Sequence, residues 1–265
     1  MSGAHVDHLV AQTGQVREQV GLEFEAGVVG ADVDAHGPAS CPIAPAAGVD
    51  GVPDGWVVAR VDPAGDVRWS VCTDAAAVLD ATTDCVAVGV DIPIGLPSGV
   101  ARRACDIEAA ARLGRARSSV FPAPPRPVLA AASYTEACAI ARELTGRAIS
   151  LQTFHIGRKI REWDALDVLP ARVVEVHPEL SLRTLAPEVD FAPKKTTRGA
   201  GQRIAALARW VDPAVALADL PAGARLDDVL DALAAAWSAR RWARGCAEVI
   251  GNETDERGRP MRVVV

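Results

Sequence analysis

Long apolar segments are what this chain of 265 residues most clearly lacks. No apolar run approaches the roughly 20 residues that a membrane-spanning helix needs, so we expect no membrane partner. The N-terminus has no basic segment followed by an apolar one, so a secretory signal peptide is not expected either. These absences predict a soluble protein with a cytoplasmic location.

Aromatic residues and clustered cysteines are also scarce. Aromatic side chains make up 4% of the chain, so the core must consist largely of Ala, Val and Leu. The six cysteines are scattered, without a CxxC pair or a Cys/His cluster, which argues against zinc and favours reduced thiols. The net charge of −6 argues against a protein that coats nucleic acid by bulk electrostatics. This net charge does not exclude an enzyme with a local basic groove.

The composition, 49% hydrophobic and 23% charged, is that of a globular protein with one large domain or two small ones. Residues 1–46 are predicted to be an extension outside the core, because residues 37–45 are linker-like. A small N-terminal helix packed on the domain is the alternative. We expect the folded domain to cover residues 47–265.

One apolar segment carries a single carboxylate and then ends at prolines and glycines. Residues 86–97 read VAVGVDIPIGLP, and the first five are apolar on both faces, which predicts a strand buried on both sides of a sheet. Pro93 ends the strand, so Asp91 lies where open α/β sheets expose chemistry. A charged carboxylate there needs a partner, usually a metal ion, unless Asp91 only caps the following turn.

The preceding segment predicts a sheet with an antiparallel part. Residues 56–61 and 67–72 are strand-like and are joined by a Pro-Ala-Gly-Asp turn, which is typical of a hairpin. Asp50 lies at or near the end of a first strand, although a turn aspartate between glycines is the alternative. Asp74 can cap a helix before the strand of Asp91. The order of strand, hairpin, helix and central strand indicates an α/β fold.

Two basic clusters follow the strand of Asp91. Arg115 and Arg117 belong to a basic segment that ends in FPAPPRP, which cannot be regular structure. Lys194, Lys195 and Arg198 lie in a loop ahead of a helix that runs through residue 210. A solvated surface explains such residues in general, but their position after a candidate carboxylate site favours contacts with an anion.

Local patterns predict further elements between and after these clusters. The capping-box spacing of Ser133 and Glu136 opens a helix to about residue 144. A second helix is predicted over residues 151–163, and a short strand over residues 172–180 contains Glu175. Residues 251–265 are polar and then strand-like, and no element is assigned to them.

The last well-patterned element is a helix over residues 227–244. It has acidic residues in its first turn and arginines in its last turn, as the helix dipole favours. Asp228 and Asp231 are three residues apart and therefore share a face. The alanines that follow allow the helix to approach a sheet closely. Charge stabilisation of the helix N-terminus is the alternative role for both aspartates.

Carboxylates are therefore predicted to converge from separate elements: Asp50, Asp91, Glu175, Asp228 and Asp231. They would repel one another unless divalent cations neutralise them. Two Mg²⁺ ions about 4 Å apart would activate a water and stabilise the leaving oxygen in phosphodiester cleavage. An ion pair with Arg172 or another nearby arginine is the alternative for Glu175. His177 is either a structural histidine or a donor behind the carboxylates.

Six motifs occur in order along the chain: GVDGVPDGWVVA, VGVDIPIGLP, RRACDIEAAARLGRARSSVFPAP, VEVHPELSL, KKT and DDVLDALAAAWSARR. As a set they resemble the bacterial and archaeal family of predicted RNase H-like nucleases that is labelled domain of unknown function number four-two-nine. The resemblance extends from about residue 48 to the C-terminus and leaves out residues 1–46. RSSVFPAP and VEVHPE are its most specific motifs.

The resemblance implies an RNase H-like α/β fold. This fold would be a mixed sheet with antiparallel first three strands, flanked by helices, with a helical basic insertion. It places Asp50 on the first strand, Asp91 on the fourth, and Asp228 and Asp231 on the final helix. There the Asp-x-x-Asp pair is similar to the closing acids of Holliday-junction resolvases. Glu175 has no obvious counterpart in every RNase H-like enzyme.

The leading hypothesis is a nuclease that uses Mg²⁺ or Mn²⁺ and acts on nucleic acid by a two-metal-ion mechanism. Its metal ligands would be Asp50, Asp91, Asp228 and Asp231, with Glu175 as a further catalytic residue, and its phosphate contacts would be Arg115, Arg117, Lys194 and Lys195. One alternative is a nucleic-acid-binding module that keeps the fold without turnover. Another is an actin-like protein that handles ATP, although the chain shows one half of such a protein and no convincing second phosphate loop.

Overall fold

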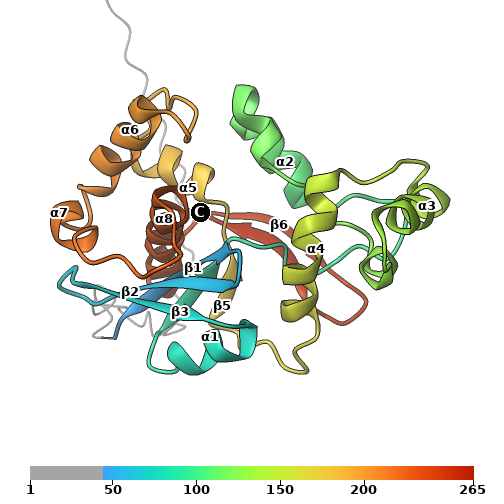
Figure 1. Cartoon of the computed structure of the whole chain (residues 1–265), viewed down its shortest axis with the longest axis horizontal. Coiled ribbons are helices and arrows are strands. Elements are labelled where there is room, and N and C mark those ends of the chain that lie inside the picture. The colour runs from blue at the N-terminus through green and yellow to red at the C-terminus, as the bar shows by residue number, and fades with distance from the viewer. Residues whose placement is uncertain (1–43) are drawn as a thin grey trace, which may run out of the picture. The chain divides into compact units, whose positions relative to one another are not determined.

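The computed structural model describes residues 44–265. The predicted extension and its alternative, a small packed helix, thus lie almost wholly outside the described residues. Within them, a five-stranded mixed sheet is flanked by helices, and a two-stranded hairpin follows it (Figure 1). This arrangement confirms the α/β prediction. The strands are β1 (Ala46–Val52), β2 (Gly55–Val61), β3 (Val67–Cys72), β4 (Ala87–Val90), β5 (Val173–Glu175), β6 (Val249–Thr254) and β7 (Pro260–Val264).

The sheet has the strand order β3-β2-β1-β4-β5. Its first three strands are antiparallel, as predicted, and β4 and β5 run parallel to β1 and to each other. The turn between β2 and β3 is held by Asp62, whose Oδ1 accepts hydrogen bonds from the backbone N–H groups of residues 64–66. An aspartate at this position is typical of such turns because its side chain bonds to the backbone that follows.

The helices connect and cover these strands. They are α1 (Ala75–Ala81), α2 (Ala104–Leu113), α3 (Tyr134–Thr145), α4 (Leu151–Asp164), α5 (Pro178–Leu185), α6 (Thr197–Leu207), α7 (Pro213–Ala216) and α8 (Leu226–Ala243), with 3₁₀ turns η1 (Gly114–Ser119) and η2 (Arg126–Ala130). Asp74 and Ser133 cap α1 and α3 through their side chains, as predicted. Among residues 44–265, no helix is long and apolar enough to cross a bilayer.

Two predicted boundaries were wrong, and one segment without an assigned element proved to be regular. The strand predicted over residues 172–180 ends at Glu175, because Pro178 starts α5 at a position where proline is favoured. Arg198 lies in the first turn of α6 rather than in the loop, since Thr196 caps that helix. The unassigned tail forms the β6–β7 hairpin, and Val264 makes a parallel bridge to Val176 beyond β5.

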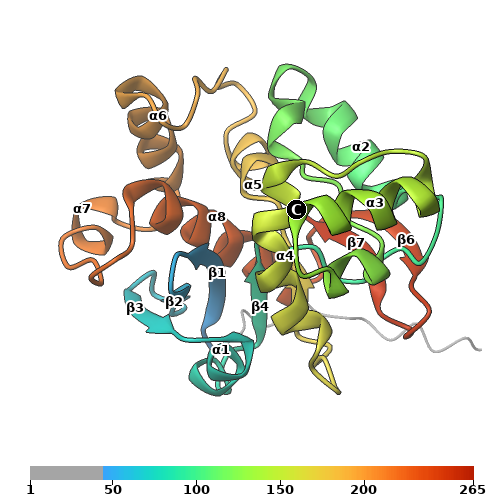
Figure 2. The ribbon, with the colours of Figure 1, turned by 45° about the vertical axis from the view of Figure 1, so that its right-hand side comes forward.

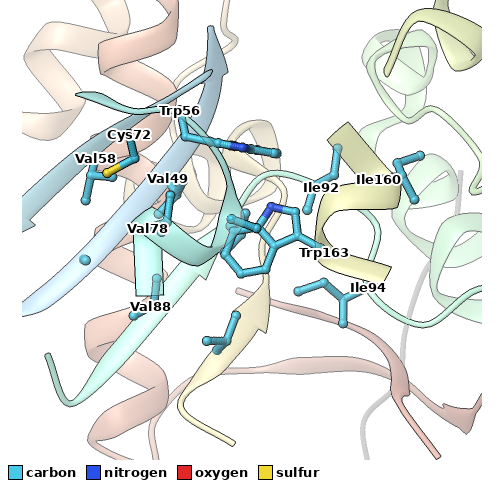
Figure 3. Packing of buried hydrophobic residues seen from close by; sticks show 14 of the residues in the cluster. Val49, Trp56, Val58, Cys72, Val78, Val88, Ile92, Ile94, Ile160 and Trp163 are labelled. Atoms are coloured by element: carbon cyan, nitrogen blue, oxygen red, sulfur yellow. The ribbon is translucent and has the colours of Figure 1, made fainter. Parts of the chain in front are cut away.

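Successive side chains along each strand point to opposite faces of the sheet and so pack into two different cores. Val49, Trp56 and Val58 pack with α1 and α4, whereas Val57 and Val61 pack with α5, α6 and α8. Figure 1 shows α8 and α1 on opposite faces. Figure 3 shows the core on the α1 side, where Trp56 meets Trp163 of α4 edge to face, with ring centroids 5.7 Å apart. Both faces are therefore covered, as a parallel region of a sheet requires.

Two glycines allow α8 to lie almost against the backbone of the sheet. A Cβ atom on Gly48 of β1 would lie 1.9 Å from the carbonyl oxygen of Ala232, and one on Gly89 of β4 would lie 2.5 Å from that of Ala235. Side chains larger than glycine on the strands, or larger than alanine on the helix, would force the two apart. The close approach predicted from the alanines of this helix is thus confirmed, and it also depends on the two glycines.

Candidate functional site

A cavity of about 870 Å³ opens at the carboxyl ends of β1, β4 and β5. Its lining comes from these strand ends, from α2, η1 and α4, and from α5, α6 and the start of α8. Figure 2 shows α2 and α6 on either side of α5. The carboxyl ends of parallel strands are where open α/β sheets place ligands, so this cavity is the candidate site.

Strand register brings Asp50 and Asp91 together. Both follow the tripeptide pattern Gly-Val-Asp, and Gly48 pairs with Gly89 while Val49 pairs with Val90. The backbone N–H of Asp91 then donates to the carbonyl of Val49 at 2.9 Å, which continues the ladder beyond β4. Because side chains alternate along a strand, each aspartate shares the face of its glycine, which is the face that α8 covers. Both aspartates line the cavity and are half-buried.

Helix α8 brings a third carboxylate to the same place. Asp231 precedes Ala232, the residue whose carbonyl nearly touches Gly48, and its side chain is only 4% exposed. Burial raises the pKa of Asp50 well above its usual value, and the charges of Asp91 and Asp231 raise it further. Burial, reinforced by Asp231, raises the pKa of Asp91 to about 8. The three groups therefore form one cluster of mutually repelling acids.

The predicted pair on α8 separates into two roles. Asp228 Oδ2 accepts a hydrogen bond from the backbone N–H of Arg225 at 3.1 Å, which caps the helix and matches the alternative role of charge stabilisation. Asp231 lies deeper, and its Oδ2 accepts from Lys194 Nζ at 2.6 Å. Burial raises the pKa of Asp231 to about 6 even though Lys194 opposes the shift. Its Oδ1 is buried and has no hydrogen-bond partner among the described residues.

Glu175 also lines the cavity, and its charge contributes to the raised pKa of Asp91, but its carboxylate is held by other partners. It pairs with Val90 across the sheet and thus faces the side opposite to Asp50 and Asp91. Its two carboxylate oxygens accept from Arg103 Nη1 and Nη2 at 2.7 and 2.8 Å, and Oε2 also accepts from the backbone N–H of Ile94 at 2.7 Å. The alternative of an ion pair with a nearby arginine therefore describes Glu175, and the arginine is Arg103 rather than Arg172.

Arg103 is the hub of a buried network that sequence reasoning missed. Its guanidinium also contacts Asp106, whose Oδ2 accepts from the backbone N–H of Ala123 at 2.9 Å. The side chains of Arg103 and Asp106 are 1% and 3% exposed. The network therefore ties the end of β5 to α2 and to the proline-rich segment after η1. The spacing of Arg103 and Asp106, three residues apart on a helix turn, is the one local signal for it.

The four basic residues predicted to contact phosphate differ in whether they line the cavity and whether they are already paired. Arg115 and Lys195 line the cavity and are exposed, from η1 on one side and from the residues before α6 on the other. Arg117 is exposed but does not line the cavity. Lys194 lines it and is bound to Asp231. Two of the four predicted residues are thus free to meet a ligand from opposite walls.

Two further side chains occupy the walls. His177 precedes α5, its Nε2 lies 3.3 Å from the carbonyl oxygen of Ser119, and its Nδ1 is buried without a hydrogen-bond partner among the described residues. Burial lowers the pKa of His177, which favours the neutral ring. Lys159 of α4 lies 4.5 Å from the ring centroid of Trp56 and donates to the carbonyl of Gly55. Burial lowers the pKa of Lys159.

The cluster has the donor chemistry of a cation site. Carboxylate oxygens are the ligands that Mg²⁺ and Mn²⁺ prefer, and the unpartnered Oδ1 of Asp231 is a free donor. As the side chains lie, no three His, Cys, Asp or Glu residues within 44–265 form a group that could hold a metal ion. The ammonium group of Lys194 is the cation that Asp231 contacts. A metal would therefore need side-chain rotations and the displacement of Lys194.

Comparison with known proteins identifies the family. No curated protein and no solved structure matches the chain. One family model matches residues 48–256, which cover the sheet from the third residue of β1 onward, all of the helices described above and the first strand of the C-terminal hairpin. The matched segment contains all the carboxylates of the cavity. The chain belongs to this family, which is described as "Protein of unknown function (DUF429)".

Proposed function

We propose that this protein is an RNase H-like nuclease that requires Mg²⁺ or Mn²⁺ and hydrolyses phosphodiester bonds of nucleic acid. The observation that carries the proposal is the meeting of Asp50, Asp91 and Asp231 from β1, β4 and α8 at the floor of one cavity. Three carboxylates gathered in one place repel one another unless a cation neutralises them. Acidic clusters of this kind serve phosphodiester cleavage when they hold divalent ions.

The fold supports the proposal in a second way. β1 pairs antiparallel with β2 and lies beside the parallel β4, and Asp50, Asp91 and Asp231 come from β1, the end of β4 and α8, which supports the resemblance to RNase H-like enzymes. Fold alone does not establish function, so the site carries the argument. Asp228 lines the cavity nearer the start of α8 and is a helix cap as well, so we assign it a supporting role beside Asp231.

The roles of the chain's own residues follow from their positions. Asp50, Asp91 and the free Oδ1 of Asp231 would hold the cation, and Lys194 would leave Asp231 to contact substrate phosphate. When bound, Mg²⁺ or Mn²⁺ lowers the pKa of a water ligand and neutralises charge on the leaving oxygen. Arg115 and Lys195 would neutralise phosphates at the two walls. Glu175 would act through Arg103, by holding α2 and the proline-rich segment after η1 in position, rather than by touching the substrate.

A cleavage panel tests the proposal. Purified protein is incubated with labelled single-stranded, duplex, hybrid and branched DNA and RNA in Mg²⁺, Mn²⁺ or EDTA. We expect cleavage that needs the metal and is lost in Asp91→Asn. The matched control is Asp167→Asn, because Asp167 is an exposed aspartate outside the cavity. Cleavage at the wild-type rate in Asp91→Asn would overturn the proposed site.

The same panel distinguishes the competing functions. Binding of nucleic acid without cleavage in any metal would identify a non-catalytic binding module. Tight binding of ATP in calorimetry, without affinity for nucleic acid, would favour an actin-like protein instead. Either result would replace the nuclease proposal.

A further inference from the structure

The walls of the cavity restrict what can reach its floor. Asp50, Asp91 and Asp231 share the cavity with residues of α2, η1 and α4 and with residues of α5 and α6, and Figure 2 shows α2 and α6 on either side of α5. The volume of about 870 Å³ falls in the range of small-ligand sites, which run from about 300 to 1,000 Å³. A volume of this size holds a few nucleotides, whereas a duplex, which is stiff over about 150 base pairs, would lie across the mouth of the cavity. An unpaired strand can enter it.

One aromatic ring in the lining is free to stack. Phe121 is partly exposed, and its ring makes no aromatic or cation–π contact within residues 44–265. The other two aromatic side chains of the lining are engaged. Trp56 is fully buried against Trp163, and Arg203 lies 5.3 Å from the ring centroid of Phe191.

The segment of Phe121 is held in place before any ligand arrives. The backbone N–H of Ala123 donates to Asp106, which belongs to the buried network of Arg103 and Glu175. Prolines at positions 122, 124 and 125 restrict the backbone on both sides of Ala123. A backbone fixed in this way leaves only the side-chain torsions of Phe121 to be ordered on binding, which favours affinity.

Positive charges on the two walls of the cavity are complementary to the negative phosphates of a single strand. Arg115 stands on one wall and Lys195 and Arg198 on the other, all exposed and lining the cavity. None of the three forms an ion pair with a residue in the described part of the chain. Proteins that bind single strands combine such a basic groove with aromatic stacking platforms.

We propose that the site takes a few unpaired nucleotides of DNA or RNA, with one base stacked on Phe121 and its flanking phosphates held by Arg115 and Lys195. The inference rests on the proposed function, because it names the substrate of the same site. In this proposal Phe121 binds a base, and Glu175 helps to position the segment of the chain that contains Phe121.

The test measures binding in the Asp91→Asn background, so that cleavage does not interfere. Short fluorescent single strands of DNA and RNA, and duplexes of the same length, are titrated by anisotropy in Mg²⁺ and in EDTA. We expect single strands to bind at least about tenfold more tightly than duplexes. Phe121→Leu should weaken single-strand binding by about 5- to 150-fold, the range for loss of one stacked base, and Phe121→Tyr should retain it.

Phe154→Leu is the matched control, because Phe154 is also partly buried but lines a different pocket. Thermal unfolding of each variant checks that the fold is intact. Equal affinity for duplex and single strand, or equal effects of the two Phe→Leu changes, would overturn the inference. In the protein with Asp91 intact, cleavage of duplexes at the rate of single strands would overturn the inference but keep the nuclease proposal. Weaker single-strand binding in Phe121→Leu, together with no cleavage in any metal when Asp91 is intact, would keep the inference but overturn the nuclease proposal.

Discussion

The ammonium group of Lys194 lies 2.6 Å from Oδ2 of Asp231, so the buried acid on α8 has a cation of its own. Burial disfavours the charge of Lys194, but Asp231 and the two acids beside it hold its pKa above the usual value. The same carboxylate is a proposed metal ligand. Under the proposed function, Lys194 and the metal would therefore compete for Asp231.

Lys194→Met should destabilise the protein in EDTA, because the buried acids lose their counter-charge. The side chain of Lys194 is 40% exposed, so we expect a loss of about 1–2 kcal/mol rather than the larger value for a fully buried pair. Mg²⁺ should restore stability and should bind the variant more tightly than the wild type. Thermal unfolding with and without Mg²⁺ measures both effects. Lys195→Met, at an exposed neighbour without an ion pair among the described residues, should change neither.

The acid cluster should make stability fall as pH rises. The folded protein holds a proton on Asp91 up to a pKa of about 8, whereas the unfolded chain releases it near pH 3.9. The unfolded state then binds fewer protons between these values, so the free energy of unfolding decreases from about pH 4 to about pH 8. Asp91→Asn should remove the part of this slope that Asp91 contributes, leaving the parts from Asp50 and Asp231, and should stabilise the apo protein at pH 8 by about 1–3 kcal/mol. Urea unfolding at several pH values measures it, and a slope unchanged in Asp91→Asn would contradict the assignment.

Glu175→Gln should act on stability and not directly on metal affinity. The change leaves Arg103 buried with one carboxylate partner instead of two, and breaking a buried ion pair costs about 3–5 kcal/mol. Chemical denaturation and Mg²⁺ calorimetry separate the two effects. Glu143→Gln, at an exposed position of α3, is the control. Weakened Mg²⁺ binding with unchanged stability would instead make Glu175 a metal ligand.

Gly48→Ala should separate α8 from the sheet. Its Cβ would collide with the carbonyl oxygen of Ala232, next to Asp231, and crowding of this kind costs about 1–3 kcal/mol. The displacement should also weaken Mg²⁺ binding, because Asp231 moves away from Asp50. Gly201→Ala in α6 meets nothing within 4 Å and should stabilise the protein by about 0.5–1 kcal/mol. Both variants can be compared by thermal unfolding.

Local chemistry explains which elements were predictable. The β2–β3 hairpin, the caps at Asp74 and Ser133 and the alanine-rich α8 all depend on residues close in sequence, and the structure contains them. The strand over residues 172–180 was predicted too long, because Pro178 can end a strand or begin a helix. The β6–β7 hairpin was missed, because its partners lie across a bulge and a polar turn.

The site was predictable as a set of acids but not as a set of contacts. Asp50, Asp91 and Asp231 stood out through strand ends and helix spacing, and they line the same cavity. The partners of the buried charges are distant in sequence. Lys194 is 37 residues from Asp231, and Arg103 is 72 residues from Glu175. Neither distance leaves a local pattern, so only the folded chain could assign these pairs.

The in-register pairing of Gly48 with Gly89 also determines where the chain can gain or lose residues. A single residue inserted within β4 before Gly89 would turn Asp91 to the face of α1 and α4, because side chains alternate along a strand. A residue added in the connections between α2 and α4 would leave Asp50, Asp91 and Asp231 where they are. We therefore expect insertions and deletions to be tolerated in the segments that form the walls of the cavity, where they can alter which ligand enters. They would leave the positions of Asp50, Asp91 and Asp231 unchanged.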